Sequence, residues 1–212
     1  MGGAPPWFAE GLAEIGVSID DATRERLGAY LARLFATNEV MNLTSITDLD
    51  EAWRKHVLDA LTIVPLLAKL PAAAQVADVG SGGGVPGIPL ALARPDLRFV
   101  LVEATRKKAA FLEAVAAELK LSNVRVVADR AETLAATKPA FDAVTARAVA
   151  SLDVLIGWTA PLVRRGGRLF LIKGQRADAE LLAAKKALAR FHCAHERTIA
   201  TPTGRIVVLR VG

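Results

Sequence analysis

The feature that most constrains the fold is an apolar run at residues 75–79, which passes through an acidic residue, Asp78, into a glycine-rich loop at residues 80–87. A strand that turns sharply into a helix needs positive φ angles and room for a ligand against bare backbone, and glycine provides both. The Gly-x-Gly-x-x-Gly spacing that starts at Gly82 is typical of nucleotide-binding turns, although plain structural turns also carry it. The sequence therefore predicts an α/β fold with a candidate ligand site at this loop.

The acidic residue narrows the choice of ligand. A carboxylate two residues before the first glycine, Gly80, has no part in binding a pyrophosphate. It suits instead a ligand with a cationic amino group, such as the methionine end of S-adenosylmethionine (SAM). We therefore expect Asp78 to contact SAM, and a nicotinamide cofactor is disfavoured.

The composition is that of an ordinary globular protein. The chain has 212 residues, 52% of them hydrophobic, which is enough to bury a sizeable core in one domain with an extension. No apolar run reaches the roughly 18 residues of a membrane span, and the N-terminal residues do not read as a signal peptide. We expect a cytoplasmic protein that does not contact a membrane. The single cysteine, Cys193, lies in an apolar segment and is interpreted as a core residue rather than a nucleophile.

The charge balance is compatible with a polyanionic partner. Lys and Arg number 27 against 22 acidic residues, which gives a formal charge of +5. Many basic enzymes bind no nucleic acid, so this excess alone does not decide the question. Several cations do lie near the ends of predicted elements, where loops can present them to a ligand. They include Arg106, Lys107, Lys108, Arg164, Arg165, Arg168, Lys173, Arg176 and Arg205.

The chain divides into a helical N-terminal extension, residues 1–70, and an alternating α/β part, residues 71–212, and we expect the two to form one compact unit. In the extension, Ser18 with Asp21 resembles a capping box, and helical spacing of apolar residues predicts a helix to about residue 36. A second helix is predicted to begin at Asp48 and to be broken or kinked by Pro65.

The α/β part predicts a doubly wound, mostly parallel, seven-stranded sheet. The predicted strands are 75–80, 98–103, 124–128, 141–146, 168–173, 193–199 and 205–211, and the helices between them are 86–94, 105–120, 151–164 and 177–191. Only residues 200–204 join the last two strands, which is too short for a parallel crossover, so the sheet should end in an antiparallel hairpin. This ending is typical of class I SAM-dependent methyltransferases rather than dehydrogenases.

Five motifs carry a resemblance to a known family over nearly the whole length. They are N-L-T-S at 42–45, K-H-V-L-D at 55–59, A-D-V-G-S-G-G-G-V-P-G-I-P at 77–89, T-A-R-A-V-A at 145–150 and L-I-K-G-Q at 171–175. The chain resembles the bacterial 16S ribosomal RNA guanine-N7 methyltransferases (the RsmG, or glucose-inhibited division protein B, family). V-P-G-I-P is the specific part, because generic SAM enzymes rarely have it. The resemblance implies SAM as cofactor, and small-subunit ribosomal RNA or the small ribosomal subunit as partner.

Two positions depart from the family pattern. The family usually has a tryptophan before the asparagine that is Asn38 here, whereas this chain has Thr37. The helix motif usually ends in Asp-Ser, and here it ends in Asp59-Ala60. Both lie outside the glycine loop, so they bear on N-terminal packing or RNA docking rather than on SAM binding.

The cofactor site follows from fold geometry together with this resemblance. In an open α/β sheet the ligand lies at the carboxyl ends of the strands near the switch point. Gly80, Gly82 and Val85 should therefore line the methionine and ribose. Glu103, at the end of the second strand, is expected to accept the ribose hydroxyls rather than to serve as a helix-start charge.

The resemblance also implies residues for the adenine and the transferred methyl. It assigns Ala131 and Glu132 to the adenine. Arg147 ends the fourth strand, and we expect it beside the methyl as a cofactor contact and positioning residue rather than as a surface arginine. The RNA-binding candidates are Lys107, Arg130, Lys173 and Arg205.

The expected chemistry needs no general base. N7 of guanine already carries an in-plane lone pair, so attack on the sulfonium methyl requires alignment and exclusion of water, but no proton removal. The sequence accordingly lacks an Asp-Pro-Pro-Tyr type of motif, and we expect no metal. With Asp59 three residues later on the same helix, His56 is interpreted as a hydrogen-bonded structural histidine rather than a base.

Two alternatives stay open beside N7 methylation of a guanine in 16S ribosomal RNA. A SAM methyltransferase for a protein or small molecule would use the same Asp78 and glycine loop. A catalytically idle RNA-binding or assembly protein would retain the fold, and Gly80→Arg would leave its RNA binding unchanged. We expect a monomer in each case.

Overall fold

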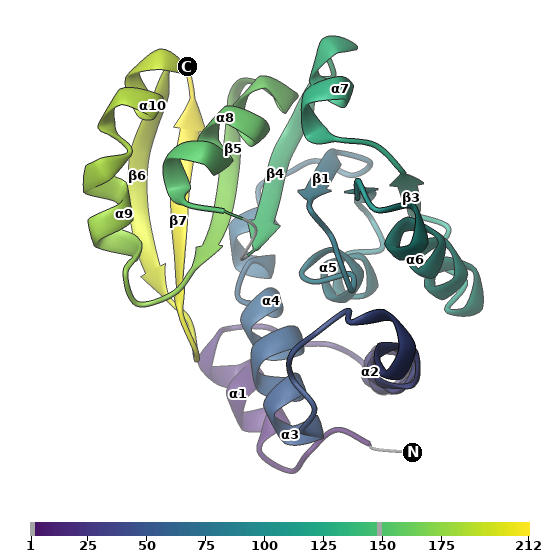
Figure 1. Cartoon of the computed structure of the whole chain (residues 1–212). Helices are drawn as coiled ribbons and strands as arrows, with labels where there is room; N and C mark the ends of the chain where they lie inside the picture. The colour runs from purple at the N-terminus through teal and green to yellow at the C-terminus, as the bar shows by residue number, and fades with distance from the viewer. Residues whose placement is uncertain (1–2, 148–149) are drawn as a thin grey trace.

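A seven-stranded sheet runs through the molecule in the computed structural model, which describes residues 3–147 and 150–212 (Figure 1). The strands are β1 (Gln75–Val79), β2 (Arg98–Val102), β3 (Val124–Val127), β4 (Phe141–Arg147), β5 (Val163–Lys173), β6 (Cys193–Ala200) and β7 (Arg205–Val211). Their order in the sheet is β3-β2-β1-β4-β5-β7-β6. Strands β1 to β5 pair in parallel, and β7 runs antiparallel to both β5 and β6. The predicted doubly wound fold with a terminal hairpin is confirmed.

The strand order places the expected ligand site. The chain moves outward from β1 to β3 on one side and then returns to pair β4 with the other edge of β1. The crevice at this reversal, outside the carboxyl ends of β1 and β4, is where open α/β sheets bind ligands. The glycine loop that follows β1 and Arg147 at the end of β4 both lie there.

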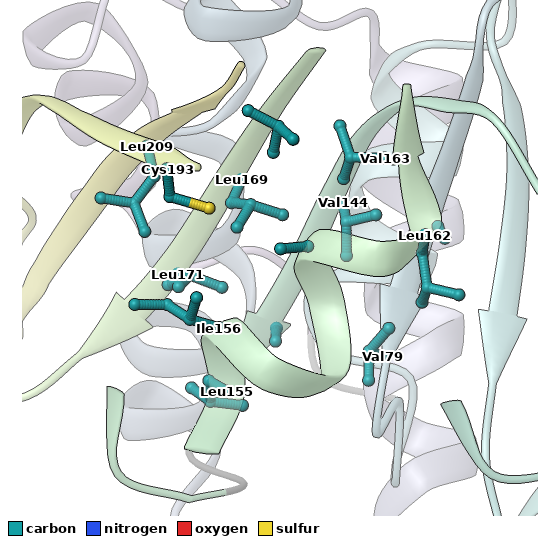
Figure 2. Close-up of a cluster of buried hydrophobic side chains, with 14 of the residues drawn as sticks. Val79, Val144, Leu155, Ile156, Leu162, Val163, Leu169, Leu171, Cys193 and Leu209 are labelled. Atoms are coloured by element: carbon teal, nitrogen blue, oxygen red, sulfur yellow. The ribbon is translucent and has the colours of Figure 1, made fainter. Parts of the chain in front are cut away.

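Helices cover both faces of the sheet, because its strands are apolar on both sides. One face carries α7 (Ala131–Ala136), α8 (Leu152–Thr159), α9 (Ala177–Ala183) and α10 (Lys185–Arg190). The other carries α5 (Gly87–Ala93), α6 (Arg106–Glu118) and the N-terminal helices. Figure 2 shows the first face, where Leu155 and Ile156 of α8 pack over Val144 and Leu171 of the sheet.

The same close-up settles the position of the lone cysteine. Cys193 lies among aliphatic side chains, including Leu169 and Leu209 (Figure 2), and is 8% exposed. Burial raises the pKa of its thiol to about 11, so the reactive thiolate is scarce at neutral pH. The interpretation of Cys193 as a core residue is confirmed.

The N-terminal extension contains more helix than the sequence predicted. Its elements are α1 (Phe8–Glu14), α2 (Asp21–Met41), α3 (Leu49–Ala52), the π-helical turn η1 (Trp53–Leu58), α4 (Asp59–Leu61) and the 3₁₀ turn η2 (Val64–Leu67). The predicted capping box was wrong, because α2 begins after Asp20, whose side chain accepts from Thr23 N at 2.7 Å. The helix also continues past residue 36 to Met41, and its C-cap, Asn42, adopts the left-handed conformation at φ 50°.

The predicted helix start at Asp48 is confirmed by its side chain, which accepts from Glu51 N at 2.8 Å. The sequence did not predict the widened turn η1, nor the short helices α1 and α7. Strand β5 also begins earlier than expected, because the 3₁₀ turn η3 (Ala160–Leu162) ends the helical segment before residue 164.

The extension packs against the glycine loop as part of one core. Leu34 of α2 and Trp53 of η1 belong to the same buried cluster as Ile88 of α5. The hydroxyl of Tyr30 donates to the Gly83 carbonyl oxygen at 2.8 Å. A Cβ at Gly83 would lie only 2.8 Å from Leu34 Cδ1, so the loop and α2 touch directly. The extension therefore helps to form the loop that the sheet presents.

Candidate functional site

Three cavities meet at the carboxyl ends of the strands, and Arg147 lines all three. The first, here called the strand-end cavity, has a volume of about 440 Å³ and lies over the ends of β1 and β2. It is lined by Val79, Gly80, Gly82, Val102, Glu103, Ala104, Lys108, Asp129, Arg130, Ala131, Glu132, Arg147 and Trp158. Most residues that the sequence assigned to a cofactor therefore come together in one place.

The wall of this cavity is built from the glycine loop and the end of β2. Gly80 and Gly82 adopt φ 70° and 53°, a region that favours glycine. Glu103 is 7% exposed, and its carboxylate accepts from Gly82 N at 2.9 Å and from Thr105 N at 2.8 Å. These two backbone donors hold an acidic group at the cavity wall, beside bare backbone.

Asp78 is not among the residues that line the strand-end cavity, and its expected contact with SAM stays a prediction. Its side chain is fully buried beneath the loop. The carboxylate accepts from Thr145 Oγ1 at 2.9 Å and from Gly87 N, at the start of α5, at 3.2 Å. Burial raises the pKa of Asp78 to about 6, although these hydrogen bonds act in the opposite direction. The acid supports the loop from below, because the turn into α5 folds over it.

The second cavity, here called the hairpin cavity, has a volume of about 640 Å³ and lies between the extension and the β6–β7 turn. It is lined by Ser45, Ile46, Lys55, Asp59, Arg147, Ile172, Lys173, Gly174, Gln175, Arg176, Glu180, Thr203 and Gly204. Eight of these residues come from four of the five motifs singled out in the sequence. Segments far apart in the chain thus share one polar, mainly cationic hollow.

Asp59 closes one side of the hairpin cavity. It is 3% exposed, and its carboxylate accepts from the backbone N and from the hydroxyl of Thr203. Burial raises the pKa of Asp59, against the effect of these hydrogen bonds. Asp59 therefore joins α4 to the β6–β7 turn, and the hydrogen-bond partners of His56 are other residues.

Lys173 is less available to a phosphate than its sequence position suggested. Its side chain is 7% exposed, and Nζ lies 2.7 Å from Glu180 Oε2 and 2.6 Å from the Ala150 carbonyl oxygen. The same Glu180 oxygen accepts from Leu152 N, at the start of α8. This ammonium is therefore already neutralised, whereas Arg176 on the same cavity is exposed.

Arg147 is a partly buried cation held by neutral acceptors. Its guanidinium donates to the Lys55 carbonyl oxygen at 2.6 Å and to His56 Nδ1 at 2.9 Å. Within the described residues, no carboxylate lies within ion-pair distance of it. Burial lowers the pKa of Arg147 from its usual range. A desolvated cation that lacks an acidic partner, at the junction of three cavities, can donate to a ligand.

The remaining predicted residues fall into two groups. Val85 lines the third and smallest cavity, of about 190 Å³, together with Gly80 and His56. Lys107 and Arg205 line none of the three, in the part of the chain that the structure describes. Lys107 is exposed on α6, and the next residue, Lys108, faces the strand-end cavity instead.

Among the lining residues that sequence reasoning did not assign to this site are Trp158 and Lys108, the latter named only as one of several cations near element ends. Lys108 belongs to the basic run at the start of α6, and only the helical phase distinguishes it from Lys107. In the sequence, Trp158 is one of several apolar residues of the segment that forms α8. No local pattern shows that its side chain reaches the cavity. The described residues hold no cluster of three metal-ligating side chains, and none of their helices is both long and apolar enough to cross a membrane.

Comparison with known proteins identifies the family of this chain. A family model described as GidB, rRNA small subunit methyltransferase G, matches residues 23–205. A "Ribosomal RNA small subunit methyltransferase G" from Sorangium cellulosum is 60% identical and covers 97% of this chain and 87% of its own. One of the same name from Lacticaseibacillus paracasei is 41% identical and covers 87% of this chain and 78% of its own.

Two solved structures share the fold. The cofactor-bound Rv0187 from MTB superposes with a TM-score of 0.65 at 22% identity and covers 100% of this chain and 99% of its own. A SAM-dependent methyltransferase from Aquifex aeolicus gives 0.60 at 12% identity and covers 81% and 97%. At these identities the likeness concerns the fold alone. From the family match and the identity to its relatives, the chain belongs to the GidB family of rRNA small subunit methyltransferases.

Proposed function

We propose that this chain transfers the methyl group of SAM to N7 of one guanine in small-subunit (16S) ribosomal RNA. The observation that carries the proposal is the pair of cavities that meet at Arg147, one at the strand ends and one between the extension and the hairpin. Membership of the GidB family supplies the reaction class and the type of RNA. A two-sided site of this kind suits a reaction between two bound molecules.

The strand-end cavity fits SAM in size and chemistry. Its volume of about 440 Å³ falls within the roughly 300–1,000 Å³ of small-ligand pockets. Glu103 can accept the two ribose hydroxyls, and the bare backbone at Gly80 and Gly82 leaves room for the methionine part. Ala131 and Trp158 offer apolar surface for the adenine. When bound, SAM supplies an electrophilic methyl group on a sulfonium.

The hairpin cavity is the proposed site of the target guanosine. Its 640 Å³ can hold a nucleoside, and Arg147 is common to both cavities. A guanidinium N–H can donate to O6 of guanine, which fixes the ring so that the neighbouring N7 lone pair faces the methyl. No proton leaves N7 during transfer, so the chain needs to align and desolvate the base rather than to deprotonate it.

The RNA backbone is proposed to contact the cations around these cavities. Arg130 and Lys108 line the strand-end cavity and Arg176 lines the hairpin cavity. Lys107 and Arg205 stay candidates for phosphates farther from the reacting atoms. With ribosomal RNA as substrate the protein acts in the cytoplasm, and we propose that it acts as a monomer.

The test is transfer of labelled methyl from SAM to small ribosomal subunits and to their deproteinised RNA, prepared from cells that lack this protein. We expect label as 7-methylguanine at one site. Gly80→Arg is the matched control, because a large side chain at φ 70° beside the cavity should abolish transfer by blocking SAM.

Other outcomes would favour different functions. SAM binding without label in either RNA substrate would contradict the proposal and indicate a protein or small-molecule substrate. RNA binding that persists unchanged in Gly80→Arg, without transfer by the wild type, would indicate an assembly protein.

A further inference from the structure

A chain of hydrogen bonds runs from the N-terminal extension into the site. Asn38 near the end of α2 accepts through Oδ1 from the backbone N of Leu43 and of Thr44, at 2.7 and 2.8 Å. The Thr44 hydroxyl lies 2.8 Å from His56 Nε2, and His56 Nδ1 lies 2.9 Å from Arg147 Nη2. These contacts link three segments that are distant in sequence, and we call Thr44, His56 and Arg147 the relay.

The partners of His56 fix which of its nitrogens carries the proton. A guanidinium can only donate, so Nδ1 must accept from Arg147. In a neutral imidazole the proton then lies on Nε2, which donates to Thr44 Oγ1. The same hydroxyl oxygen also accepts from Ile46 N at 3.0 Å, consistent with an acceptor role.

The surroundings keep His56 in this neutral form. The side chain is 2% exposed, and burial, together with the neighbouring charge of Arg147, lowers its pKa to about 3. A protonated ring would place two cations 2.9 Å apart. The histidine is therefore a permanent acceptor under ordinary conditions, and it is not suited to act as a base that cycles through a charged state.

Two acceptors in the extension fix the position of the Arg147 guanidinium. Lys55 O and His56 Nδ1 hold two of its five N–H donors from the side of the extension. The remaining donors are left for the cavities that Arg147 lines. A guanidinium that could rotate away from this position would present these donors at the wrong angle.

We propose that His56 is a positioning residue for methyl transfer, acting through its Nδ1 acceptor on Arg147, and that Thr44 fixes its tautomer. The inference rests on the proposed function, in which Arg147 orients the target guanine. It gives the N-terminal extension a part in the reaction that the sheet alone does not provide. Loss of the Nδ1 acceptor should lower the rate of transfer without a comparable loss of SAM affinity.

Two substitutions separate the two nitrogens of the ring. In His56→Asn the amide oxygen can occupy the place of Nδ1 and still accept from Arg147. In His56→Gln the amide reaches the place of Nε2, keeps the contact with Thr44 and leaves Arg147 without its acceptor. Both variants lose the same buried ring and differ from each other by one methylene, so their unfolding temperatures are compared to separate packing from the effect of the acceptor. His195→Gln, at an exposed histidine on β6, is the control.

The first measurement is kcat and KM for methyl transfer to small-subunit RNA. We expect kcat to fall about 100-fold in His56→Gln and less than about tenfold in His56→Asn, with SAM dissociation constants within about threefold of wild type. His195→Gln should match wild type. Equal losses in the two His56 variants, or losses that follow their unfolding temperatures, would overturn the proposal.

The second measurement is independent of turnover. The ¹⁵N chemical shifts of the three histidines report which ring nitrogen is protonated, and we expect His56 to be protonated at Nε2 alone. A proton on Nδ1 would overturn the relay, because Arg147 could not then donate to it. If wild type methylates no small-subunit RNA, the proposed function fails, and the tautomer still decides whether the relay exists.

Discussion

At the scale of single residues, the site is organised by buried charges whose environments differ. Arg147 is a cation held by neutral acceptors, whereas Asp78 is an anion whose hydrogen-bond donors are a hydroxyl and a backbone N–H. Neither lies opposite a formal countercharge at ion-pair distance within the described residues. Burying a charged group costs free energy unless hydrogen bonds compensate for its lost hydration. Substitution of Arg147 should therefore change methyl transfer, and titration of Asp78 should change stability.

Arg147→Ala should reduce methyl transfer far more than SAM binding. We expect kcat to fall by at least about 100-fold, because the target base loses its alignment, with SAM affinity within about threefold of wild type. Arg147→Lys should recover little activity, since a single ammonium cannot reproduce the planar donors that contact both Lys55 O and His56 Nδ1. Single-turnover transfer and calorimetric SAM binding measure the two effects. Equal turnover in wild type and Arg147→Ala would remove the residue from the site.

Asp78 should make the stability of the protein depend on pH. Its pKa is about 6 in the folded state against 3.8 ordinarily, so the folded protein retains a proton that the unfolded chain has lost. The free energy of unfolding should therefore decrease as the pH rises from about 4 to about 6, by on the order of 2–3 kcal/mol, and then level off.

The comparison is with Asp78→Asn, in which this group cannot titrate. An amide can still accept from Gly87 N while its NH₂ donates to Thr145 Oγ1, so the fold should be retained. Urea unfolding at a series of pH values should show a smaller decrease over this interval in the variant. Parallel curves for the two proteins would show that Asp78 is ionised normally.

At the scale of elements, the shape of the site depends on two close contacts, one between α5 and β1 and one between the β6–β7 turn and the extension. Helix α5 begins directly over Asp78 because Gly87 has no side chain. The β6–β7 turn reaches the extension because Thr203 binds Asp59. Both contacts join a local turn to a residue that is distant in the sequence. The cavities therefore depend on where elements meet rather than on any element by itself.

Gly87→Ala should destabilise the protein, whereas Gly157→Ala should not. A Cβ at Gly87 would lie 2.3 Å from Leu101 Cδ2 and 2.9 Å from Asp78 Oδ2, so α5 must shift, at a cost of about 1–3 kcal/mol. At Gly157, within α8, the nearest atom is Phe191 Cε2 at 3.7 Å. Alanine there should stabilise the helix by up to about 1 kcal/mol. The urea concentration at the midpoint of unfolding measures both effects. An unchanged midpoint in Gly87→Ala would contradict the close packing of α5 against Leu101 and Asp78.

Substitutions around the hairpin cavity should distinguish a residue that contacts an RNA phosphate from one that forms a structural ion pair. Arg176→Ala is expected to reduce the slope of log affinity against log salt by about 0.7–0.9, the effect of one lost phosphate contact. Lys173→Ala should leave this slope unchanged, because its ammonium is already paired with Glu180. Lys186→Ala, an exposed residue on α10, is the control. The reverse ranking of Arg176 and Lys173 would return Lys173 to its original role as an RNA contact.

At the scale of the whole molecule, the extension and the sheet share a core and a site. Buried residues from both parts form one cluster, and Tyr30 of α2 donates to the glycine loop. The relay also crosses between the two parts. We propose that residues 1–70 and 71–212 fold as one unit rather than as two domains, since neither part completes its core without the other.

Coincident unfolding would support this proposal. Trp7 and Trp53 lie in the extension and Trp158 lies on α8, so a Trp158→Phe protein reports on the extension, and a protein with both Trp7→Phe and Trp53→Phe reports on α8. Their fluorescence should give the same urea midpoint as far-UV circular dichroism of the same protein. Two separated midpoints would show that the extension unfolds independently.

The sequence alone was enough to predict most of the fold. Apolar runs that alternate with helical periodicity gave all seven strands, and the short connection 200–204 gave the antiparallel hairpin. The short helices α1 and α7 were missed because six or seven residues carry too little periodicity to be distinguished from a loop. The widened turn η1 was missed because its wider spacing follows from packing rather than from residue type.

The sequence by itself determined the fold class and the place of a candidate ligand site along the chain, because the glycine loop, the acid after β2 and the arginine at the end of β4 are local features of strand ends. Only the tertiary structure decided how these groups act. It buried Asp78 under α5, paired Lys173 with Glu180 and brought His56 to Arg147. Each of these outcomes depends on a neighbour that is distant in the chain. Local pattern carries no information about such neighbours, since solvation and hydrogen bonding are properties of the packed molecule.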